Sequence, residues 1–353
     1  MTPVRLGVVG LGFIGQTHLR AIAAAKSAGL PVELVAVADA RPDLLTGRLA
    51  AVGNLDLNGQ NDALFDPTVT RTFTHPGDLF ALSDLDAVVI ATPTDTHEPL
   101  AAAALRDGKH VLLEKPVALD VATIRRLAAA EANSGRRLVP AMVMRHWPGW
   151  PFLADCIRDH RYGPLHALRL SRLGARPAWS PFYADPARCG GALADLHIHD
   201  ADFILHALGR PTHALSLGHL DHVTTAYRFS AATTAPIVLA EGAWLPSQGR
   251  GFRMRYVAEF ASATVEFDLA ASPTVRILRD DRVEHPEIPL IDGFTPQMHH
   301  FIECVAAWKR GLPGPSAASL RDAVDVTMLL NAERASLSSG SWESVLSGGD
   351  SHV

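Results

Sequence analysis

The stretch VRLGVVGLGFIG, residues 4–15, decides the fold of this chain. It opens with a short Val-rich apolar run, which is typical of a buried parallel strand. Three glycines follow, Gly10, Gly12 and Gly15, and the Ala-rich segment 14–25 then predicts a helix. A strand, a glycine turn and a helix in this order indicate the start of a dinucleotide-binding fold.

Each glycine of this turn has a different expected task. Gly10 allows the tight turn, Gly12 lets the backbone approach a pyrophosphate, and Gly15 lets the helix pack closely on the strand. The helix N-terminus has free N–H groups and a positive dipole end, which favour phosphate binding. Phe13 and Ile14 stand at this N-terminus, so we expect them to contact the cofactor as well.

The acidic residue of the dinucleotide fingerprint is also present. The apolar run VELVAVAD, residues 32–39, ends in Asp39, close to the expected distance from the glycines. A carboxylate here accepts a hydrogen bond from the ribose 2′-OH and repels a 2′-phosphate, which favours NAD over NADP. Arg41, two residues later, could tolerate a 2′-phosphate. In the alternative interpretation Asp39 only ends a strand.

Strands and helices continue to alternate up to residue 145. We expect strands at 86–92, 109–116 and 137–144, helices at 42–51, 96–106 and 120–134, with Thr96 as an N-cap, and a loop at 53–68. This alternation predicts a doubly wound parallel sheet over residues 1–145. Ligands of such sheets bind at the carboxyl ends of the strands. The segments ATPTDTH (91–97) and EKP (114–116) follow such ends. The residues expected to line the cofactor cleft are therefore Thr92, Pro93, His97, Glu114 and Lys115.

The pattern changes after residue 145. A helix at 149–163 and a strand at 164–174 are followed, between 212 and 288, by several strand-like runs without helices between them. Consecutive strands of this kind predict a mostly antiparallel sheet, hence an α+β domain over residues 146–353. Two helices near 296–309 and 318–338 close the chain, and the last could return to the first domain.

The stretch GGALADLHIHD, residues 190–200, carries the second group of chemically active residues. His-x-His followed by Asp resembles the start of a zinc ligand set. The apolar residues after Leu193 recur at helical spacing, however, and Gly209 then ends the segment. On a helix Asp195 and His199 share a face, whereas His197 and His199 diverge. The helical context therefore argues against a metal site, and a capped helix with exposed polar residues is the remaining alternative.

These motifs resemble the Gfo/Idh/MocA family of nicotinamide-dependent sugar and cyclitol oxidoreductases. The similarity spans nearly the whole chain and is carried by GLGFIG, ATPTDTH, GKHVLLEKP and GGALADLHIHDAD. It implies that Lys115, Asp195 and His199 are catalytic, and that His97 lies near the nicotinamide ribose. One departure is His197, which stands where the family usually has Gly.

The residue types suit the oxidation of a secondary alcohol, and the resemblance implies that this alcohol belongs to a sugar, polyol or cyclitol. A nicotinamide cofactor takes the hydride, and the proton needs a base that titrates near neutrality, such as His199. Asp195 could orient the imidazole, and Lys115 could donate a hydrogen bond to the substrate oxygen. Weaker candidates for substrate contact, each of which could equally be a packing residue, are Arg145, Trp147, Trp179 and His197.

Composition narrows the class of protein. The net charge of −5 gives no indication of nucleic-acid or membrane binding, and no apolar run reaches membrane-spanning length. Three widely spaced cysteines and an N-terminus without a signal-peptide pattern predict a cytoplasmic protein. Arg greatly outnumbers Lys, so each Lys, Lys109 and Lys309 among them, is a mild hint that a compact amine is needed there.

Two other functions stay open at this point: a non-catalytic dinucleotide- and sugar-sensing regulator on the same fold, and a metal hydrolase that uses His197 and His199. The strand-like runs 224–229 and 264–268 place apolar residues on one side and, in part, on the other. A sheet with two partly apolar faces predicts a homodimer or homotetramer.

Overall fold

The structure is a computed structural model, and it describes all residues except 1, 49–62, 231–234, 248, 250 and 346–353. The chain forms two compact units. The first unit comprises Met1–His146 and Ile291–Val324, and the second comprises Trp147–Leu290 and Asp325–Val353. None of the helices in the described ranges combines the length and hydropathy that a bilayer span requires.

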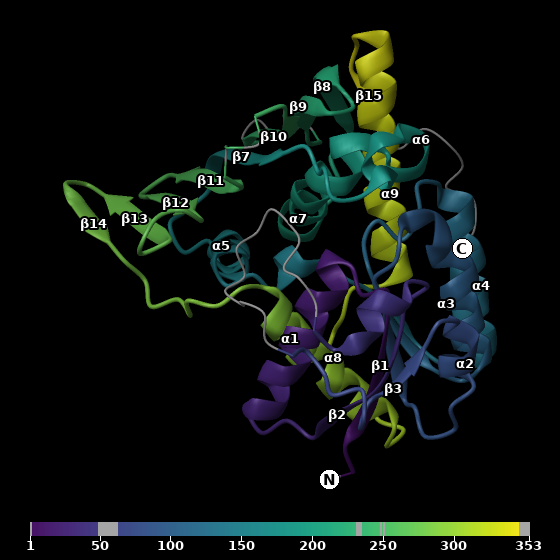
Figure 1. The fold of residues 1–353 in the computed structure, drawn as a ribbon. Coiled ribbons are helices and arrows are strands. Elements are labelled where there is room, and N and C mark those ends of the chain that lie inside the picture. The colour runs from purple at the N-terminus through teal and green to yellow at the C-terminus, as the bar shows by residue number, and fades with distance from the viewer. Residues whose placement is uncertain (1, 49–62, 231–234, 248, 250, 346–353) are drawn as a thin grey trace. The chain divides into compact units, whose positions relative to one another are not determined.

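A six-stranded parallel sheet forms the centre of the first unit, with strand order β3-β2-β1-β4-β5-β6 (Figure 1). Its strands are β1 (Val4–Val9), β2 (Val32–Ala38), β3 (Arg71–Phe73), β4 (Ala87–Ile90), β5 (His110–Leu113) and β6 (Leu138–Pro140). Every residue of β4 and β5 is buried, which explains why these strands are continuous apolar runs in the sequence. The predicted doubly wound parallel sheet is confirmed.

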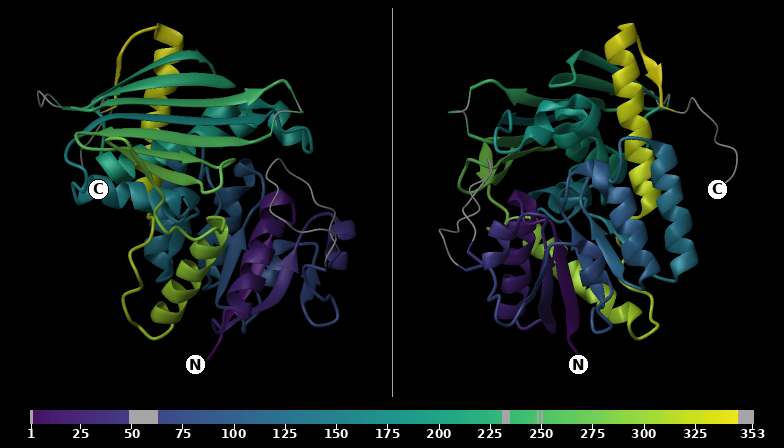
Figure 2. Two further views of the ribbon diagram at one scale, coloured as in Figure 1. Left: turned by 90° about the vertical axis from the view of Figure 1, so that its left-hand side faces the viewer. Right: turned by 45° about the vertical axis from the view of Figure 1, so that its right-hand side comes forward.

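In the part of the first unit that the structure describes, five helices belong wholly to it: α1 (Phe13–Ser27), α2 (Pro76–Phe80), α3 (His97–Arg106), α4 (Val121–Ser134) and α8 (Phe294–Trp308). α3 packs on α4, and α1 packs on α8, with the His18 ring edge-on to Phe294 at 5.9 Å between centroids. Figure 2 shows the two pairs on opposite sides of the sheet. The helix that completes the Rossmann unit from the C-terminal part of the chain is therefore α8.

The segment after β2 differs from its predicted helix. Pro42–Thr46 forms a short 3-10 turn, which ends at Gly47 with a φ of 82°. A Cβ on Gly47 would lie 2.2 Å from the carbonyl oxygen of Phe65, so the close approach of these two loops requires glycine here. The remainder of the predicted helix and most of the predicted loop at 53–68 lie outside the described residues.

α3 begins where the sequence indicates, but Thr96 does not cap it. The Thr96 hydroxyl donates to the carbonyl oxygen of Pro93 at 2.7 Å and lies 2.7 Å from the Thr92 hydroxyl. The hydroxyl is thus used within the loop that follows β4, where it stabilises the turn rather than the helix.

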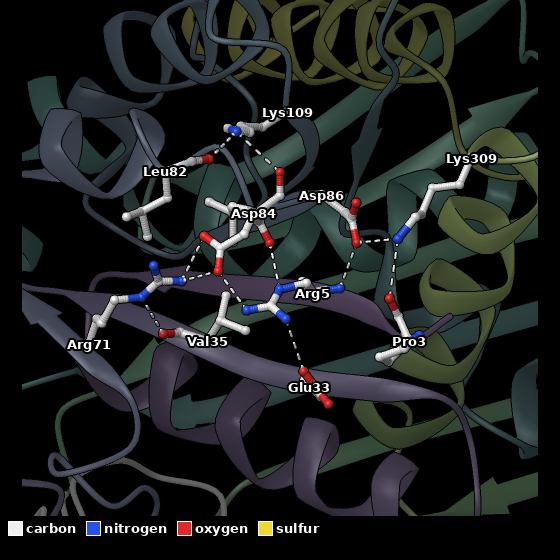
Figure 3. Close-up of polar contacts among 11 residues, drawn as sticks. Pro3, Arg5, Glu33, Val35, Arg71, Leu82, Asp84, Asp86, Lys109 and Lys309 are labelled. Atoms are coloured by element: carbon white, nitrogen blue, oxygen red, sulfur yellow. Dashed lines mark hydrogen bonds and ion pairs between the residues drawn. The ribbon is translucent and has the colours of Figure 1, made fainter. Parts of the chain in front are cut away.

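The amino ends of the parallel strands are held by lysines. Lys109 Nζ donates to the carbonyl oxygens of Leu82 and Leu85, and Lys309 Nζ lies 2.6 Å from an Asp86 carboxylate oxygen and also donates to Pro3. Figure 3 shows both lysines in a wider network of polar contacts at this end of the sheet. Two of the four lysines therefore have structural tasks, at the edge opposite the carboxyl ends of the strands.

A nine-stranded sheet dominates the second unit, with strand order β14-β13-β12-β11-β7-β10-β9-β8-β15 (Figures 1 and 2). Its strands are β7 (Leu165–Ala175), β8 (His213–His219), β9 (His222–Arg228), β10 (Ile237–Leu245), β11 (Arg253–Phe260), β12 (Thr264–Asp268), β13 (Val275–Arg279), β14 (Arg282–Glu284) and β15 (Glu343–Ser344). All neighbours pair antiparallel except β7 and β10, which are parallel. The predicted mostly antiparallel sheet is confirmed.

One face of this sheet is covered by helices. The helices of the second unit are α5 (Gly149–Arg158), α6 (Pro186–Cys189), α7 (Ile198–Leu208) and the C-terminal part of α9 (Leu320–Ser339). Trp150 of α5 lies at the centre of the core, edge-on to Phe203 of α7 and to Tyr256 of β11. We refer to this covered side as the inner face and to the opposite side as the outer face.

Candidate functional site

The three glycines of the turn after β1 differ in how much space surrounds each of them. Gly10 has a φ of 89°, and a Cβ there would lie 2.6 Å from the Ala91 carbonyl oxygen. A Cβ on Gly15 would lie 1.8 Å from the Gly10 carbonyl oxygen. Gly12, in contrast, has an ordinary φ of −67°, and its Cβ would meet no protein atom within 4 Å. The chain itself therefore needs Gly10 and Gly15, whereas Gly12 keeps a space clear.

That space suits the pyrophosphate of a dinucleotide. It lies at the start of α1, whose N-cap Gly12 offers no side chain to its N–H groups. Phe13 and Ile14 contribute the first of these groups. Backbone N–H groups that are not capped by a side chain, at the positive end of a helix dipole, bind phosphate oxygens. The residues present therefore fit the cofactor that the sequence predicts.

Asp39 is held beside the same turn. One carboxylate oxygen accepts from the Leu11 N–H at 2.7 Å, and the other accepts from the Arg41 N–H at 2.8 Å. The Arg41 side chain is largely exposed, and its Nε lies 3.7 Å from the carboxylate. Asp39 thus links the end of β2 to the glycine turn, in addition to ending the strand. Each oxygen can accept a second hydrogen bond, as from a ribose hydroxyl.

His97 bridges the two loops expected to line the cleft. Its Nδ1 lies 2.9 Å from the Pro116 carbonyl oxygen, and its Nε2 lies 2.9 Å from the Thr92 carbonyl oxygen. Burial lowers the pKa of His97, although the two carbonyls and Glu114 favour the charged ring. The buried imidazole therefore braces the loop after β4 against the loop after β5. Its contact with a nicotinamide ribose stays a prediction.

Glu114 and Lys115 are positioned by a histidine that the sequence analysis missed. The Glu114 carboxylate lies 2.7 Å from Nε2 of His18, and both side chains are buried. The other Glu114 oxygen accepts from the Lys115 N–H at 3.1 Å. The available signal was spacing: His18 follows Gly15 by three residues on α1, so both face the sheet. The α1 helix thereby fixes the backbone from which the Lys115 side chain extends.

The segment with Asp195 and His199 begins with a π turn. The predicted regular helix is Leu193–His197 in π conformation followed by α7. In a π turn each backbone hydrogen bond spans five residues instead of four, and such turns occur frequently at functional sites. A single widened turn hardly changes the spacing of apolar residues, so the sequence pattern could not reveal it.

The exposure pattern of this segment singles out two residues. From Cys189 to Ile204 every residue is buried except Asp195 and His199, which are half-buried. The two side chains that the sequence paired as a catalytic acid and base are thus the accessible ones of an otherwise buried segment. Asp202 follows Asp195 by seven residues, which places it on the same side of a regular helix, and it is buried.

His197 points into the core of the second unit. Its Nε2 lies 3.1 Å from the Tyr227 hydroxyl and 3.0 Å from a Glu333 carboxylate oxygen, and the ring is fully buried. This placement disfavours the predicted contact with substrate. It also separates His197 from the half-buried His199, which disfavours a shared metal. Among the described residues no group of three or more His, Cys, Asp and Glu side chains is placed to hold a metal ion.

The weaker substrate candidates have diverse surroundings. Arg145, in the first unit, lies 3.0 Å from Asp322 in an ion pair. Trp147 is buried, and Trp179 is half-buried with its ring edge-on to Tyr183 at 5.7 Å between centroids. Their contact with a substrate stays a prediction.

Comparison with known proteins agrees with this geometry. The model of an oxidoreductase family with an NAD-binding Rossmann fold matches residues 4–142, and the Gfo/Idh/MocA C-terminal domain matches residues 152–271. The chain belongs to the Gfo/Idh/MocA family. Residues 4–142 are its NAD-binding Rossmann domain.

Proteins similar to this chain include named dehydrogenases. The chain is 31% identical to inositol 2-dehydrogenase of Rhizobium meliloti (strain 1021) over 206 residues, which are 58% of this chain and 55% of that protein. It is 34% identical to inositol 2-dehydrogenase 4 of Saccharopolyspora erythraea over 217 residues, 61% of this chain and 57% of that protein. The chain thus spans little more than half the length of these relatives. A levoglucosan dehydrogenase in complex with NADH and levoglucosan has the same fold, with a TM-score of 0.78 at 18% identity over 98% of this chain and 100% of that one.

Proposed function

We propose that this protein is an NAD-dependent oxidoreductase that interconverts a secondary alcohol and a ketone on a sugar, polyol or cyclitol. The observation that carries the proposal is that Asp195 and His199 are the two accessible residues of an otherwise buried segment. A general acid–base site needs a carboxylate and an imidazole that a substrate can reach, and this segment leaves one of each accessible while its other residues are buried.

His199 acts as the general base in alcohol oxidation and as the general acid in the reverse direction. An imidazole titrates near neutrality, so it can hold or release the hydroxyl proton at physiological pH. The Asp195 carboxylate, on the same accessible side, favours the charged imidazole and orients the ring. These two residues together move the proton, while the hydride leaves the substrate carbon.

Lys115 stabilises negative charge on the substrate oxygen. Its ammonium is a compact donor, and charge that develops on an alkoxide is best stabilised by a donor already held in place. The Lys115 backbone is held by Glu114, which His18 holds in turn. The glycine turn and Asp39 would hold the pyrophosphate and ribose of NAD, which would supply the hydride acceptor when bound.

A panel of sugars, cyclitols and their keto forms, assayed by nicotinamide absorbance, tests the proposal. We expect His199→Ala and Lys115→Ala each to lower turnover by about 10²-fold or more while NAD binding survives. Matched controls are His206→Ala, exposed on α7, and Lys26→Ala, exposed on α1. Near-normal turnover in either site variant would show that its role is wrong. Sugar and NAD binding without turnover in the unmutated protein would instead favour the sensing regulator.

We further propose that the outer face of the nine-stranded sheet joins copies of this chain into a dimer or tetramer. Leu217 is 65% exposed and Ile237 is 61% exposed. Between them Leu215, Ala226 and Leu239 lie side by side in register on β8, β9 and β10. Leu215, Ala226 and Leu239 are half-buried, and together with the two exposed residues they form an aliphatic strip that is costly to hydrate, so a second copy is a better partner than water. Sedimentation at micromolar concentration would contradict this with a single species near 37.8 kDa.

A cytoplasmic location completes the proposal. All three cysteines, Cys156, Cys189 and Cys304, are free and buried. Unpaired thiols persist in a reducing compartment, which is the basis of this assignment. Fractionation of producing cells with an antibody against the protein checks it.

A further inference from the structure

The buried side of the π turn is held by a three-residue polar cluster. His197 Nε2 faces both the Tyr227 hydroxyl and a Glu333 oxygen, and Tyr227 donates to the other Glu333 oxygen at 2.8 Å. The three residues come from the π turn, β9 and α9. The sheet adds a fourth contact, because a Cβ on Gly242 would lie 2.7 Å from the Cβ of His197. The ring is therefore enclosed by the sheet and by α9.

A charge argument favours a proton on this ring, although its buried Nδ1 has no hydrogen-bond partner among the described residues. Asp200 lies against Arg172 at 2.8 Å with both side chains buried, so the Asp200 charge is already compensated. Glu333 is fully buried, and an uncompensated buried carboxylate costs several kcal/mol. A proton on His197 supplies the compensating charge. Burial by itself lowers the pKa of His197, but the Glu333 carboxylate outweighs it and raises the pKa above its ordinary value.

We propose that His197 is a positioning residue for the reaction: its charged ring, bound to Glu333 and Tyr227, fixes the π turn and thereby sets the placement of Asp195 and His199. The inference rests on the proposed function, because it assigns His197 a task toward those two residues. His197 stands between them, two residues from each, and points to the opposite side. A rotation or shift of the turn therefore moves both accessible side chains together. Misplacement by about 1 Å can cost about 10²-fold in rate.

The polar and charged groups that face this ring come from four elements. They are Tyr227 of β9, Glu333 of α9, Asp200 of α7 and Arg172 of β7, while Gly242 of β10 contributes no side chain. Burial raises the pKa of Tyr227 well above its ordinary value, so its hydroxyl stays neutral. His197, in its contact with the Glu333 carboxylate, is thus the ring whose protonation the cluster favours.

The anchor is tested first without reference to activity. We compare His197→Ala, His197→Gln and Glu333→Gln by hydrogen exchange of the segment 193–202, with His206→Ala as the matched control. His197→Ala should speed exchange of this segment about tenfold, an opening cost of 1.4 kcal/mol. His197→Gln should preserve most of the protection, because its amide nitrogen can replace Nε2 as the hydrogen-bond partner of the Tyr227 hydroxyl beside Glu333. Unchanged exchange in His197→Ala would overturn the anchor.

The charge on the ring is tested by nitrogen NMR on protein labelled at histidine. The signals of His197 are assigned by their loss in His197→Gln. At pH about 7.5, above the ordinary histidine pKa, we expect them at the positions of a protonated ring. Signals of a neutral ring would overturn the charged form of the anchor.

The positioning role is tested by kinetics on the folded variants at saturating NAD. His197→Ala should lower kcat about 10- to 100-fold, with the Kd for NAD within about twofold of the unmutated protein, and His197→Gln should recover most of the loss. A primary deuterium isotope effect on kcat should rise in His197→Ala, since slower chemistry becomes rate-limiting; a purely structural loss of folded protein would leave it unchanged. Faster exchange with unaltered kcat would overturn the positioning role alone. No turnover in the unmutated protein with any substrate would overturn the proposed function and the positioning role together, while the exchange result still decides the anchor.

Discussion

Replacing Gly12 with Ala should separate cofactor binding from folding. The φ of −67° at Gly12 is open to any residue, and the new methyl group meets no protein atom within 4 Å. Two small effects on stability oppose each other: Ala in place of Gly stiffens the unfolded chain by about 0.4–1 kcal/mol, whereas Ala is a poorer N-cap by up to about 1 kcal/mol. The free energy of unfolding should therefore change by less than about 1 kcal/mol, or about 4 °C in Tm.

NAD binding should respond much more strongly to the same methyl group. The methyl occupies the space through which a phosphate approaches the N–H groups at the start of α1. Loss of one charge-assisted hydrogen bond costs about 1.5–3 kcal/mol, so the Kd for NAD should rise about 10- to 100-fold. Gly15→Ala is the contrasting variant, because its Cβ would lie 1.8 Å from the Gly10 carbonyl oxygen and the turn cannot form.

Calorimetric unfolding with and without NAD measures both quantities at once. A ligand that binds only the folded state raises its stability by an amount set by its concentration relative to Kd. The unmutated protein should gain Tm on addition of NAD, whereas Gly12→Ala should unfold at nearly the same temperature with and without it. Titration of nicotinamide fluorescence then gives the Kd directly. Wild-type affinity in Gly12→Ala, or a loss of stability as large as that of Gly15→Ala, would refute the reasoning.

Four further outcomes are expected. Asp39→Ser should narrow the preference for NAD over NADP in steady-state kinetics, because the carboxylate repels a 2′-phosphate; equal use of both cofactors by the unmutated protein would contradict this. Asp200→Asn should cost about 3–5 kcal/mol in urea unfolding, because it leaves the buried guanidinium of Arg172 without its carboxylate, and a loss under about 1 kcal/mol would count against that account. The folded-state pKa of His197 lies above its ordinary value, so the stability that its charged ring contributes should be complete below about pH 6.5 and should decline as pH rises above that. Denaturant unfolding of the unmutated protein and of His197→Gln between about pH 5.5 and 9 measures this contribution as a difference in free energy of unfolding. A difference that does not change with pH would argue against a charged ring. Chelation should leave activity unchanged, and stoichiometric metal lost together with activity would overturn the assignment of residues 195–202.

The architecture was predictable where local patterns are strong and long. The run from β1 through α1 to β2 has both apolar periodicity and glycine chemistry, and each signal predicts the same element. β3 has three residues and α2 has five, which is too short to display either period. The composition of residues 42–46 suits a helix as well as a 3-10 turn, and the contact with Phe65 that decides between them lies well beyond the segment.

The candidate site was predictable to the extent that it depends on neighbours along the chain. Helical spacing indicated that Asp195 and His199 share a side and that His197 does not. The partners that define each environment are distant: Glu114 is 96 residues from His18, and Glu333 meets His197 from the other end of the chain. Pairings of this kind depend on the folded topology, which the periodicity of one segment does not contain.

The return of the chain to its first unit has a consequence for synthesis. The six parallel strands leave the ribosome early. The helix α8, which packs on α1, belongs to Ile291–Val324 and leaves it much later, with only α9 and the C-terminal residues still to follow. Until then the apolar side of α1 and the carboxylate of Asp86, the later partner of Lys309, have no α8 to meet. Domains usually fold as they emerge, amino-terminal first, and exposed apolar surface in a half-made chain invites aggregation. Residues 147–290 of the second unit are therefore made while the first unit is incomplete. A fragment that stops at residue 146 would keep all six strands but not the helix that covers α1.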